Sequence, residues 1–169
     1  QGSRLTNEVK IMDKETVKHY FLYVGGNLIR NFTSGGSIAG SKVGSKNDQG
    51  YEQVQIDGKK HKVHRLVFLY HHGYLPKNID HINGIRDDNR IENLRKCSRS
   101  QNQMNEKLRP NNTSGIKGVS WCKSAERWRA RVQAYGKVKY VGNFKSRAKA
   151  EQAVKNARSV LHGEFSRHK

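Results

Sequence analysis

Residues 78–107, NIDHINGIRDDNRIENLRKCSRSQNQMNEK, contain the pattern that decides the fold. Residues 79–82 predict one short strand and residues 94–97 a second, and the polar loop between them begins at the turn Asn83-Gly84. Ser98 or Ser100 can cap a helix that carries residues 101–108. The stretch therefore predicts the order strand, loop, strand, helix, with acidic, imidazole and amide side chains facing inward.

Within this stretch, Asp80 and His81 are the side chains best suited to chemistry. Histidine titrates near neutral pH, so His81 is a candidate general base. Chemistry at phosphate also needs a hard cation on the leaving oxygen, and oxygen ligands such as Asp80 or an Asn amide suit Mg²⁺ or Mn²⁺ better than zinc. Adjacent residues of a flat strand point to opposite sides, so Asp80 and His81 can serve one site only if the strand bends or bulges.

The spacing of Asp80-His81, Asn93 twelve residues on and Asn102 nine further resembles the HNH nuclease motif in its Asp-His…Asn…Asn form. Two flanking blocks, His64-Arg65-Leu66-Val67 and residues 89–95 (NRIENLR), are similar to the phage and intron-homing branch of that family. The alternative is a hydrogen-bonded histidine in an Asn-rich polar loop. The combined spacing and flanking blocks favour the nuclease.

The resemblance implies a ββα-metal finger that holds one divalent cation. Carried over by position, Asp80 and Asn102 are the metal ligands and His81 is the general base, while Asn93 braces the loop and orients the histidine. Many members have His where this chain has Asn102, and the amide favours Mg²⁺ over transition metals that bind more tightly. Some members place a third ligand four residues further on, where this chain has Glu106, and the role of that residue stays open.

The segments ahead of the motif are bounded by turn residues. Gly- and Asn-containing turns predict two hairpins, over residues 20–32 and 51–63. Residues 35–50 are rich in Gly, Ser and Lys and predict a mobile loop, and residues 64–73 predict a helix that ends at a glycine. The first 50 residues match no known pattern and are assigned no role beyond completing the sheet of the nuclease domain.

Positive charge is concentrated in the last third of the chain. Residues 109–169 contain 15 Lys and Arg against 3 Asp and Glu, a net charge of +12, whereas residues 1–108 contain 18 against 11, a net charge of +7. The change falls at residues 109–115, RPNNTSG, which are helix and strand breakers and small polar residues. This composition predicts a linker between two domains, with a surface loop inside one domain as the alternative.

The carboxy-terminal segment predicts three strands and a helix. The strands are residues 118–123, 127–134 and 137–144, and Ser146 caps a helix that Gly163 ends. The predicted apolar stripe of this helix is Ala150, Ala153, Val154, Ala157, Val160 and Leu161. In the second strand Arg127, Arg129 and Arg131 alternate with apolar residues, so the three cations share one face. The helix should cover the opposite face. An exposed row of arginines fits the major groove of DNA, where Arg can bond guanine O6 and N7.

This segment resembles the plant ethylene-response-factor (APETALA-type) DNA-binding domain. The pieces that match are Gly118-Val119-Ser120-Trp121, residues 127–132, Tyr140-Val141-Gly142-Asn143-Phe144 and the Ala-rich helix. The predicted DNA contacts are Arg127, Arg129, Arg131, Tyr140, Lys123 and Lys139. Ser120 stands where plant members often have Arg, and Arg131 where many have Glu, so their sequence preference does not transfer. The alternative is a solvated charged face on a small structural sheet.

Composition restricts the class of partner. The chain has 169 residues, a formal net charge of +19 and a pI near 10.2, which point to a polyanion, most simply nucleic acid. No apolar run approaches the roughly 20 residues of a membrane span. Two cysteines without a CxxC spacing argue against a disulfide scaffold or a zinc site. We therefore expect a protein of the reducing cytoplasm, in a bacterial or phage-infected host cell.

The complete interpretation is an α+β protein with two domains. Residues 4–108 form the nuclease domain, with its finger at about residues 78–108, residues 109–117 form a linker, and residues 118–169 form a small three-stranded antiparallel sheet packed on one helix. The expected activity is sequence-guided hydrolysis of double-stranded DNA with one Mg²⁺ or Mn²⁺ per site, in a free-standing homing endonuclease. We expect no membrane and no small-molecule cofactor. A restriction or modification-dependent nuclease and a non-catalytic DNA-binding regulator are the alternatives.

Overall fold

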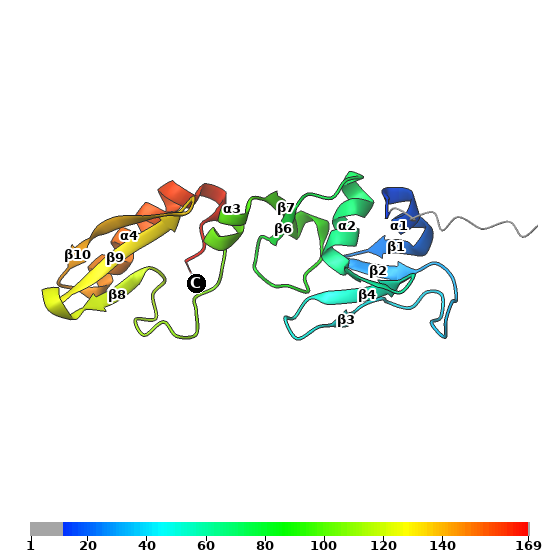
Figure 1. Ribbon diagram of the computed structural model, residues 1–169, viewed down its shortest axis with the longest axis horizontal. Coiled ribbons are helices and arrows are strands. Elements are labelled where there is room, and N and C mark those ends of the chain that lie inside the picture. The colour runs from blue at the N-terminus through cyan, green and yellow to red at the C-terminus, as the bar shows by residue number, and fades with distance from the viewer. Residues whose placement is uncertain (1–11, 169) are drawn as a thin grey trace, which may run out of the picture. The chain divides into compact units, whose positions relative to one another are not determined.

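The computed structural model describes residues 12–168, which have mixed helix and strand content compatible with the α+β class (Figure 1). Contacts divide the chain into two compact units. The amino-terminal unit comprises the residues up to Leu75 together with Arg86–Leu94, and the carboxy-terminal unit comprises Pro76–Ile85 and the residues from Arg95 onward. The linker predicted at residues 109–117 lies inside the second unit, and the predicted domain boundaries stay a prediction.

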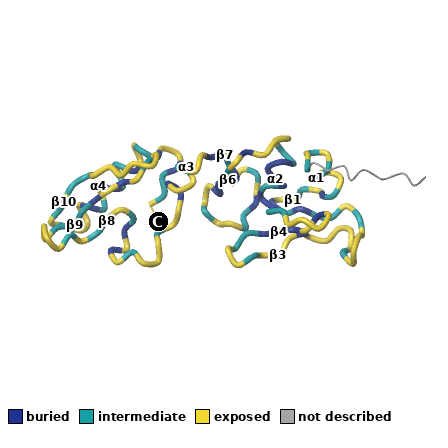
Figure 2. Tube along the Cα trace, viewed as in Figure 1, coloured by how far each residue is buried: buried dark blue, intermediate teal, exposed yellow. Residues whose placement is uncertain are grey.

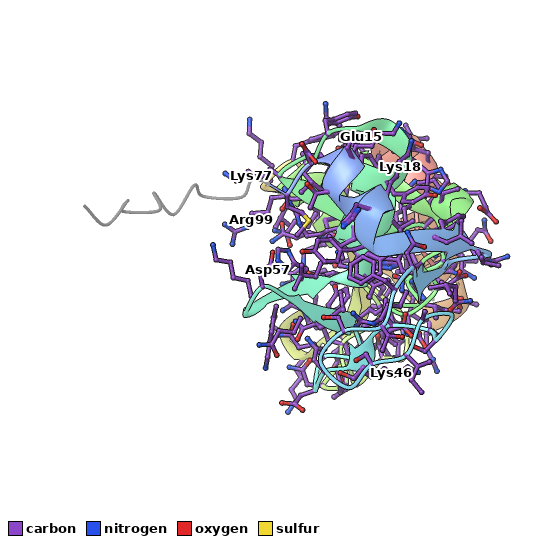
Figure 3. All side chains as sticks on the ribbon, turned by 90° about the vertical axis from the view of Figure 1, so that its right-hand side faces the viewer. Glu15, Lys18, Lys46, Asp57, Lys77 and Arg99 are labelled. Atoms are coloured by element: carbon purple, nitrogen blue, oxygen red, sulfur yellow. The ribbon has the colours of Figure 1, made fainter. Side chains whose placement is uncertain are left out.

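Short elements with well-defined ends build the amino-terminal unit. They are α1 (Lys14–Tyr20), β1 (Phe21–Val24), β2 (Asn27–Arg30), β3 (Ser45–Lys46), β4 (Glu52–Ile56), β5 (Lys59–Lys62), α2 (Val63–His72) and the 3₁₀ turn η1 (Ile91–Asn93). The Asp13 side chain accepts a hydrogen bond from the Thr16 amide and caps α1, and Gly73, in the left-handed region, ends α2. Both predicted hairpins are present, as β1–β2 and β4–β5, with Asp57 at the turn of the second (Figure 3).

The predicted loop over residues 35–50 takes part in the fold. Val43 is buried and its amide donates to the Leu28 carbonyl oxygen at 2.9 Å. The Lys42 ammonium pairs with the buried Glu52 carboxylate at 2.8 Å, and Ser45 and Lys46 pair with β4 as a short edge strand. Glycine and serine content is typical of loops, but one valine and one ion pair attach this loop to the sheet. The composition alone does not report those contacts.

The core of the amino-terminal unit lies between its helices and hairpins. The side chains with almost no exposed surface are Val17, Phe21, Leu28, Val63, Leu66 and Val67. Figure 2 shows the buried stretches of the chain in dark blue. Helix α2 contributes three of them on one face, as the pattern of its apolar residues predicts. His64 is also buried on α2, with its ring 5.2 Å from the ring of Tyr51, so it has the packed position expected of a core histidine.

The first part of the carboxy-terminal unit contains two short strands followed by a helix. Strand β6 (Asn78–His81) pairs with β7 (Leu94–Cys97), and α3 (Arg99–Met104) follows. Ser98 is the N-cap of α3 and forms a capping box with Gln101, which settles the choice between Ser98 and Ser100. The helix ends at Met104, earlier than the predicted Leu108, because the chain turns at the buried Asn105.

The second part of that unit is an antiparallel sheet with one long helix. The strands β8 (Val119–Cys122), β9 (Arg127–Ala134) and β10 (Lys137–Phe144) are arranged in the order β10-β9-β8, and α4 (Arg147–His162) follows. Two 3₁₀ turns, η2 (Lys123–Ala125) and η3 (Gly163–Phe165), follow β8 and α4. One apolar cluster joins the sheet to the helix through Val119, Ala130, Val132, Ala150 and Val154. The predicted stripe of α4 is wrong at Val160, which is 84% exposed.

Close packing at the start of the sheet explains one glycine. Gly118 has φ +82°, and a Cβ atom there would collide with the Arg131 carbonyl oxygen. That oxygen lies in β9, so the glycine allows β8 to begin against its neighbour. No helix within residues 12–168 has the length and apolar content needed to cross a membrane.

Candidate functional site

The candidate site is centred on Asp80 and His81 at the end of β6. Both residues are only 5% exposed, which is unusual for a carboxylate and an imidazole in a basic protein. A buried carboxylate needs charged or hydrogen-bonding partners, because burial without them costs several kcal/mol. The partners of Asp80 therefore define the site.

Arg95, from β7, is the charged partner of Asp80. Its Nε and Nη2 atoms both donate to Asp80 Oδ2, at 3.0 and 2.9 Å. Nη1 donates to the Glu164 carbonyl oxygen at 2.8 Å, and the guanidinium carbon lies 3.6 Å from the centre of the Phe165 ring. Arg95 thus connects the strand that carries Asp80 to η3 at the end of α4, and it holds the carboxylate in one orientation.

Asn105 is the second partner, and the sequence interpretation missed it. This residue follows α3 and is buried, and its Nδ2 atom lies 3.0 and 2.9 Å from the two Asp80 carboxylate oxygens. It also donates to the His81 carbonyl oxygen at 2.8 Å. All these neighbours are acceptors, so the amide nitrogen is correctly placed towards them. One amide thereby fixes the backbone of both candidate site residues.

The predicted ligand Asn102 lies elsewhere. It is exposed on α3, and no hydrogen bond joins its side chain to another residue within the described part of the chain. Asn102 and Asn105 are spaced i, i+3 in the same Asn-Gln-Met-Asn sequence, so the pattern contained two candidate amides. The motif spacing selects the first, while the structure brings the second into contact with Asp80.

The turn after His81 is covered by a cation. The Gly84 amide donates to the His81 carbonyl oxygen at 2.8 Å, and Gly84 has φ +66°. A Cβ atom at this position would collide with the guanidinium of Arg167, so the absence of a side chain leaves room for that group. A second arginine from the end of the chain therefore lies beside the candidate site, and sequence spacing gave no signal for it.

Asn93 has a bracing position inside the amino-terminal unit. It is buried, and its Nδ2 atom donates to the Asp88 carbonyl oxygen at 2.7 Å, across the loop that precedes η1. In the same loop Asn89 donates to the buried Glu52 carboxylate at 2.8 Å. The predicted role of Asn93 in bracing the loop is consistent with this contact, and its role in orienting His81 stays a prediction.

The candidate metal ligands of the site are oxygen atoms, which hard cations prefer. No group of three or more His, Cys, Asp or Glu side chains that could hold a metal ion occurs within residues 12–168. Asp80 Oδ2 accepts from Arg95 and Asn105, while Oδ1 accepts only from Asn105 among the residues that the structure describes. A carboxylate oxygen with an open lone pair and an exposed amide oxygen fit Mg²⁺, which keeps several waters and takes one or two protein ligands.

The second candidate surface is the face of β9 that carries the arginines, here called the arginine face. Ala130 and Val132 are buried against α4, while Arg131 is exposed and Arg127 and Arg129 are half-buried. Tyr140 lies opposite Arg131 on the neighbouring strand, and directly opposed residues share a face. Arg127, Arg129, Arg131 and Tyr140 therefore lie on one face of the sheet, as the alternation predicts.

Two further predicted contacts have different positions. Lys139 lies opposite Val132, so the register places it on the face that α4 covers rather than with Tyr140. Lys123 is exposed in η2, at the end of the hairpin between β8 and β9. The Arg129 Nη2 atom donates to Cys122 Sγ at 2.7 Å. Hydrogen bonding to Ser124 and the Ala125 backbone, with the positive charge of Arg129, lowers the pKa of the Cys122 thiol.

Comparisons with known proteins concern the segment that contains these residues. The model of the HNH endonuclease family matches residues 61–104, which include Asp80, His81, Asn93 and Asn102. Protein 3.8 of Escherichia phage T7 is 40% identical to this chain over 108 residues, which cover 62% of this chain and 87% of the phage protein. No solved structure matches the chain. The chain therefore belongs to the family of phage T7 Protein 3.8, and it contains an HNH endonuclease domain.

Proposed function

We propose that this protein is a metal-dependent endonuclease that hydrolyses phosphodiester bonds in double-stranded DNA at the site formed by Asp80 and His81. One observation carries the proposal. A carboxylate and an imidazole, both 5% exposed, are adjacent on β6 inside the segment that matches the HNH endonuclease family, and the carboxylate is fixed by Arg95 and Asn105.

His81 is proposed as the general base. An ordinary imidazole titrates near neutral pH, so its neutral form is available to accept a proton from water. Its backbone is fixed by the hydrogen bonds from Asn105 and Gly84 to its carbonyl oxygen. A fixed backbone reduces the conformational freedom that the catalytic ring must lose before reaction.

Asp80 and Asn102 are proposed to hold one divalent cation, Mg²⁺ or Mn²⁺. When bound, such a cation stabilises the negative charge that develops on the leaving oxygen of a phosphodiester. Asp80 is the anchored ligand, because Arg95 and Asn105 hold its carboxylate. Asn102 is exposed on α3 and has no competing side-chain partner among the described residues, so its amide oxygen is accessible to a metal.

The arginine face is proposed to bind the duplex. Arg127, Arg129 and Arg131 stand in a row on β9 with Tyr140 beside them, and the sheet is antiparallel with α4 on its other side. Arginines in such a row repel each other unless a polyanion neutralises them. This arrangement supports docking on DNA in the manner of the ethylene-response-factor domain and guidance of the cut by sequence, as in a free-standing homing endonuclease.

The proposal is tested by cleavage of a genomic DNA library and sequencing of the ends. Wild-type protein with Mg²⁺ should produce ends at a defined sequence, and EDTA should abolish them. His81→Ala should reduce cleavage at least about a hundredfold, the usual size of a general-base effect, while DNA binding is retained. His19→Ala, at an exposed histidine of α1, is the matched control and should cleave normally. Binding without cleavage by the wild-type protein would identify a non-catalytic DNA-binding regulator instead.

A further inference from the structure

A pocket of about 520 Å³ lies within the carboxy-terminal unit, and Asp80 is not among the residues that line it. Its walls come from the segment after α3, from β9 and β10 and from α4. The polar groups that carry the argument are Lys117, Arg131, Arg158 and His162. The volume is in the range of pockets that hold a small organic ligand, and it exceeds what one water or one simple ion needs.

Lys117 is a half-buried cation at the pocket. Its ammonium donates to the carbonyl oxygens of Met104 and Glu106. Burial, and after it repulsion from Arg158, lowers the pKa of Lys117 to about 8. The ammonium has three hydrogens and these two carbonyls use two of them. One donor therefore remains for a ligand.

Arg158 adds a second buried charge. It is 2% exposed and donates to the carbonyl oxygens of Lys117 and Arg167. Within residues 12–168, no Asp or Glu carboxylate forms an ion pair with Lys117 or Arg158, and Glu106 contributes only a longer-range attraction to Lys117. A buried cation without a counter-ion destabilises a fold, so the buried Arg158 and the half-buried Lys117 beside one pocket point to an anionic ligand.

His162 provides an independent sign of a missing ligand. It is 6% exposed, and its Nε2 atom lies 3.0 Å from the Gln133 carbonyl oxygen, so Nε2 carries the proton. The other ring nitrogen, Nδ1, is buried without a hydrogen-bond partner among the described residues. Buried polar atoms are rarely left unpaired in native proteins. Nδ1 is then an acceptor, so its partner must be a donor, and a water molecule held beside a ligand in the pocket can supply it.

The pocket is continuous with the arginine face. Arg131 lines it, and so do Gln133 and Val138, which oppose each other across β9 and β10 on that same face. A duplex bound to the arginine face therefore brings its sugar-phosphate backbone to the pocket. This continuity favours a phosphate of bound DNA over an unrelated anion.

We propose that this pocket binds a phosphate group of the DNA backbone, with Lys117 as its principal donor and Arg131 at its rim. The proposal rests on the proposed function for the identity of the polyanion. A free nucleotide also carries a phosphate that this pocket could bind. The experiment therefore distinguishes a phosphate of the DNA backbone from that of a free nucleotide.

The test measures binding of the full chain to a fluorescent duplex at several salt concentrations. Lys117→Met should weaken binding about tenfold and reduce the slope of log K against log salt by about 0.9, which is the loss of one phosphate contact. Lys149→Met removes an exposed lysine from the first turn of α4 and should change the affinity less than twofold. Lys117→Arg keeps the charge and should retain the slope. An unchanged affinity and slope for Lys117→Met would overturn the proposal.

Competition at constant ionic strength identifies the source of the phosphate. Inorganic phosphate and a deoxynucleoside monophosphate should displace DNA from the wild-type protein and have less effect on Lys117→Met. A nucleotide that binds through Lys117 while DNA affinity is unaffected by the substitution would overturn the DNA assignment. The competition on wild-type protein needs no variant, so it decides the matter if Lys117→Met does not fold. Failure of the wild-type protein to bind DNA at all would instead contradict the proposed function.

Discussion

Arg95 makes the contacts on which the geometry of Asp80 depends. Its side chain is 12% exposed and that of Asp80 is 6% exposed, so the two hydrogen bonds from Arg95 to Asp80 Oδ2 are shielded from solvent. The ion pair does not by itself stabilise the protein strongly, because both charges lose hydration. Its function is to hold one carboxylate orientation. The protein loses stability when only one member of this ion pair is removed, because the other charge stays buried without its partner.

Arg95→Ala should therefore destabilise the protein strongly. It leaves the Asp80 carboxylate buried with Asn105 as its remaining partner, and it removes the guanidinium from the Phe165 ring. Loss of one member of a buried pair costs about 3–5 kcal/mol, and the lower value is expected because Asn105 remains. Urea unfolding measures the change as a lower midpoint. Arg99→Ala, at an exposed arginine of α3 (Figure 3), should stay within about 0.5 kcal/mol of wild type. Equal effects of the two substitutions would contradict the assigned role.

Much of the candidate site could be predicted from sequence, and the missing part has a physical reason. Asp80 and His81 lie at a strand end before a turn, and these are features of local pattern. Arg95 contacts Glu164, which is 69 positions away in the chain, and no local periodicity reports such a contact. Asn105 was not predicted as a site residue because Asn102, three positions earlier, is an equally plausible amide side chain. Choosing between them requires knowing that the helix ends at Met104.

At the scale of elements, the hairpin of β9 and β10 determines which cations lie on the arginine face. A two-residue turn at Tyr135-Gly136, with both φ angles positive, connects the strands. Counting outward from this turn pairs Lys137 with Ala134 and Lys139 with Val132. The alternation within β9 was readable from its own sequence. The face on which Lys139 lies could also be predicted, but only by using the position of the turn to pair the residues of β10 with those of β9.

The register gives a matched pair of substitutions. Arg129→Ala removes a cation from the arginine face and should weaken DNA binding about tenfold, with relaxed sequence preference if the side chain contacts a base edge. Lys139→Ala removes the same formal charge from the opposite face and should change affinity about twofold or less. Fluorescence titration with a target and a scrambled duplex measures both. A larger loss for Lys139→Ala would show that the other face binds DNA.

At the scale of the whole molecule, the candidate site and the basic sheet belong to the same compact unit. Residues 109–169, which have a net charge of +12, include the sheet of β8, β9 and β10, then α4 and η3. The segment that returns to the site is η3. Phe165 packs in one cluster with Cys97 and Met104, and Arg95 lies on its ring. The end of the chain is thus part of the structure that supports Asp80. The charge pattern predicts two domains, and this division stays a prediction. Within the carboxy-terminal unit, these contacts join the end of the chain to Arg95, the partner of Asp80.

Phe165→Ala tests this dependence between the end of the chain and the site. Removing the buried ring leaves a cavity beside Cys97 and Met104, and such substitutions cost about 3–5 kcal/mol of unfolding free energy. Because Arg95 also loses its stacking partner, cleavage by the folded fraction should fall several-fold, while DNA affinity stays close to wild type since the arginine face is unchanged. Val160→Ala is the control at an exposed apolar residue of α4 and should alter neither quantity. Single-turnover cleavage at a temperature where both variants are folded, with binding measured in parallel without metal, separates the effects. Normal cleavage by folded Phe165→Ala would mean that the last residues stabilise the fold without positioning Asp80.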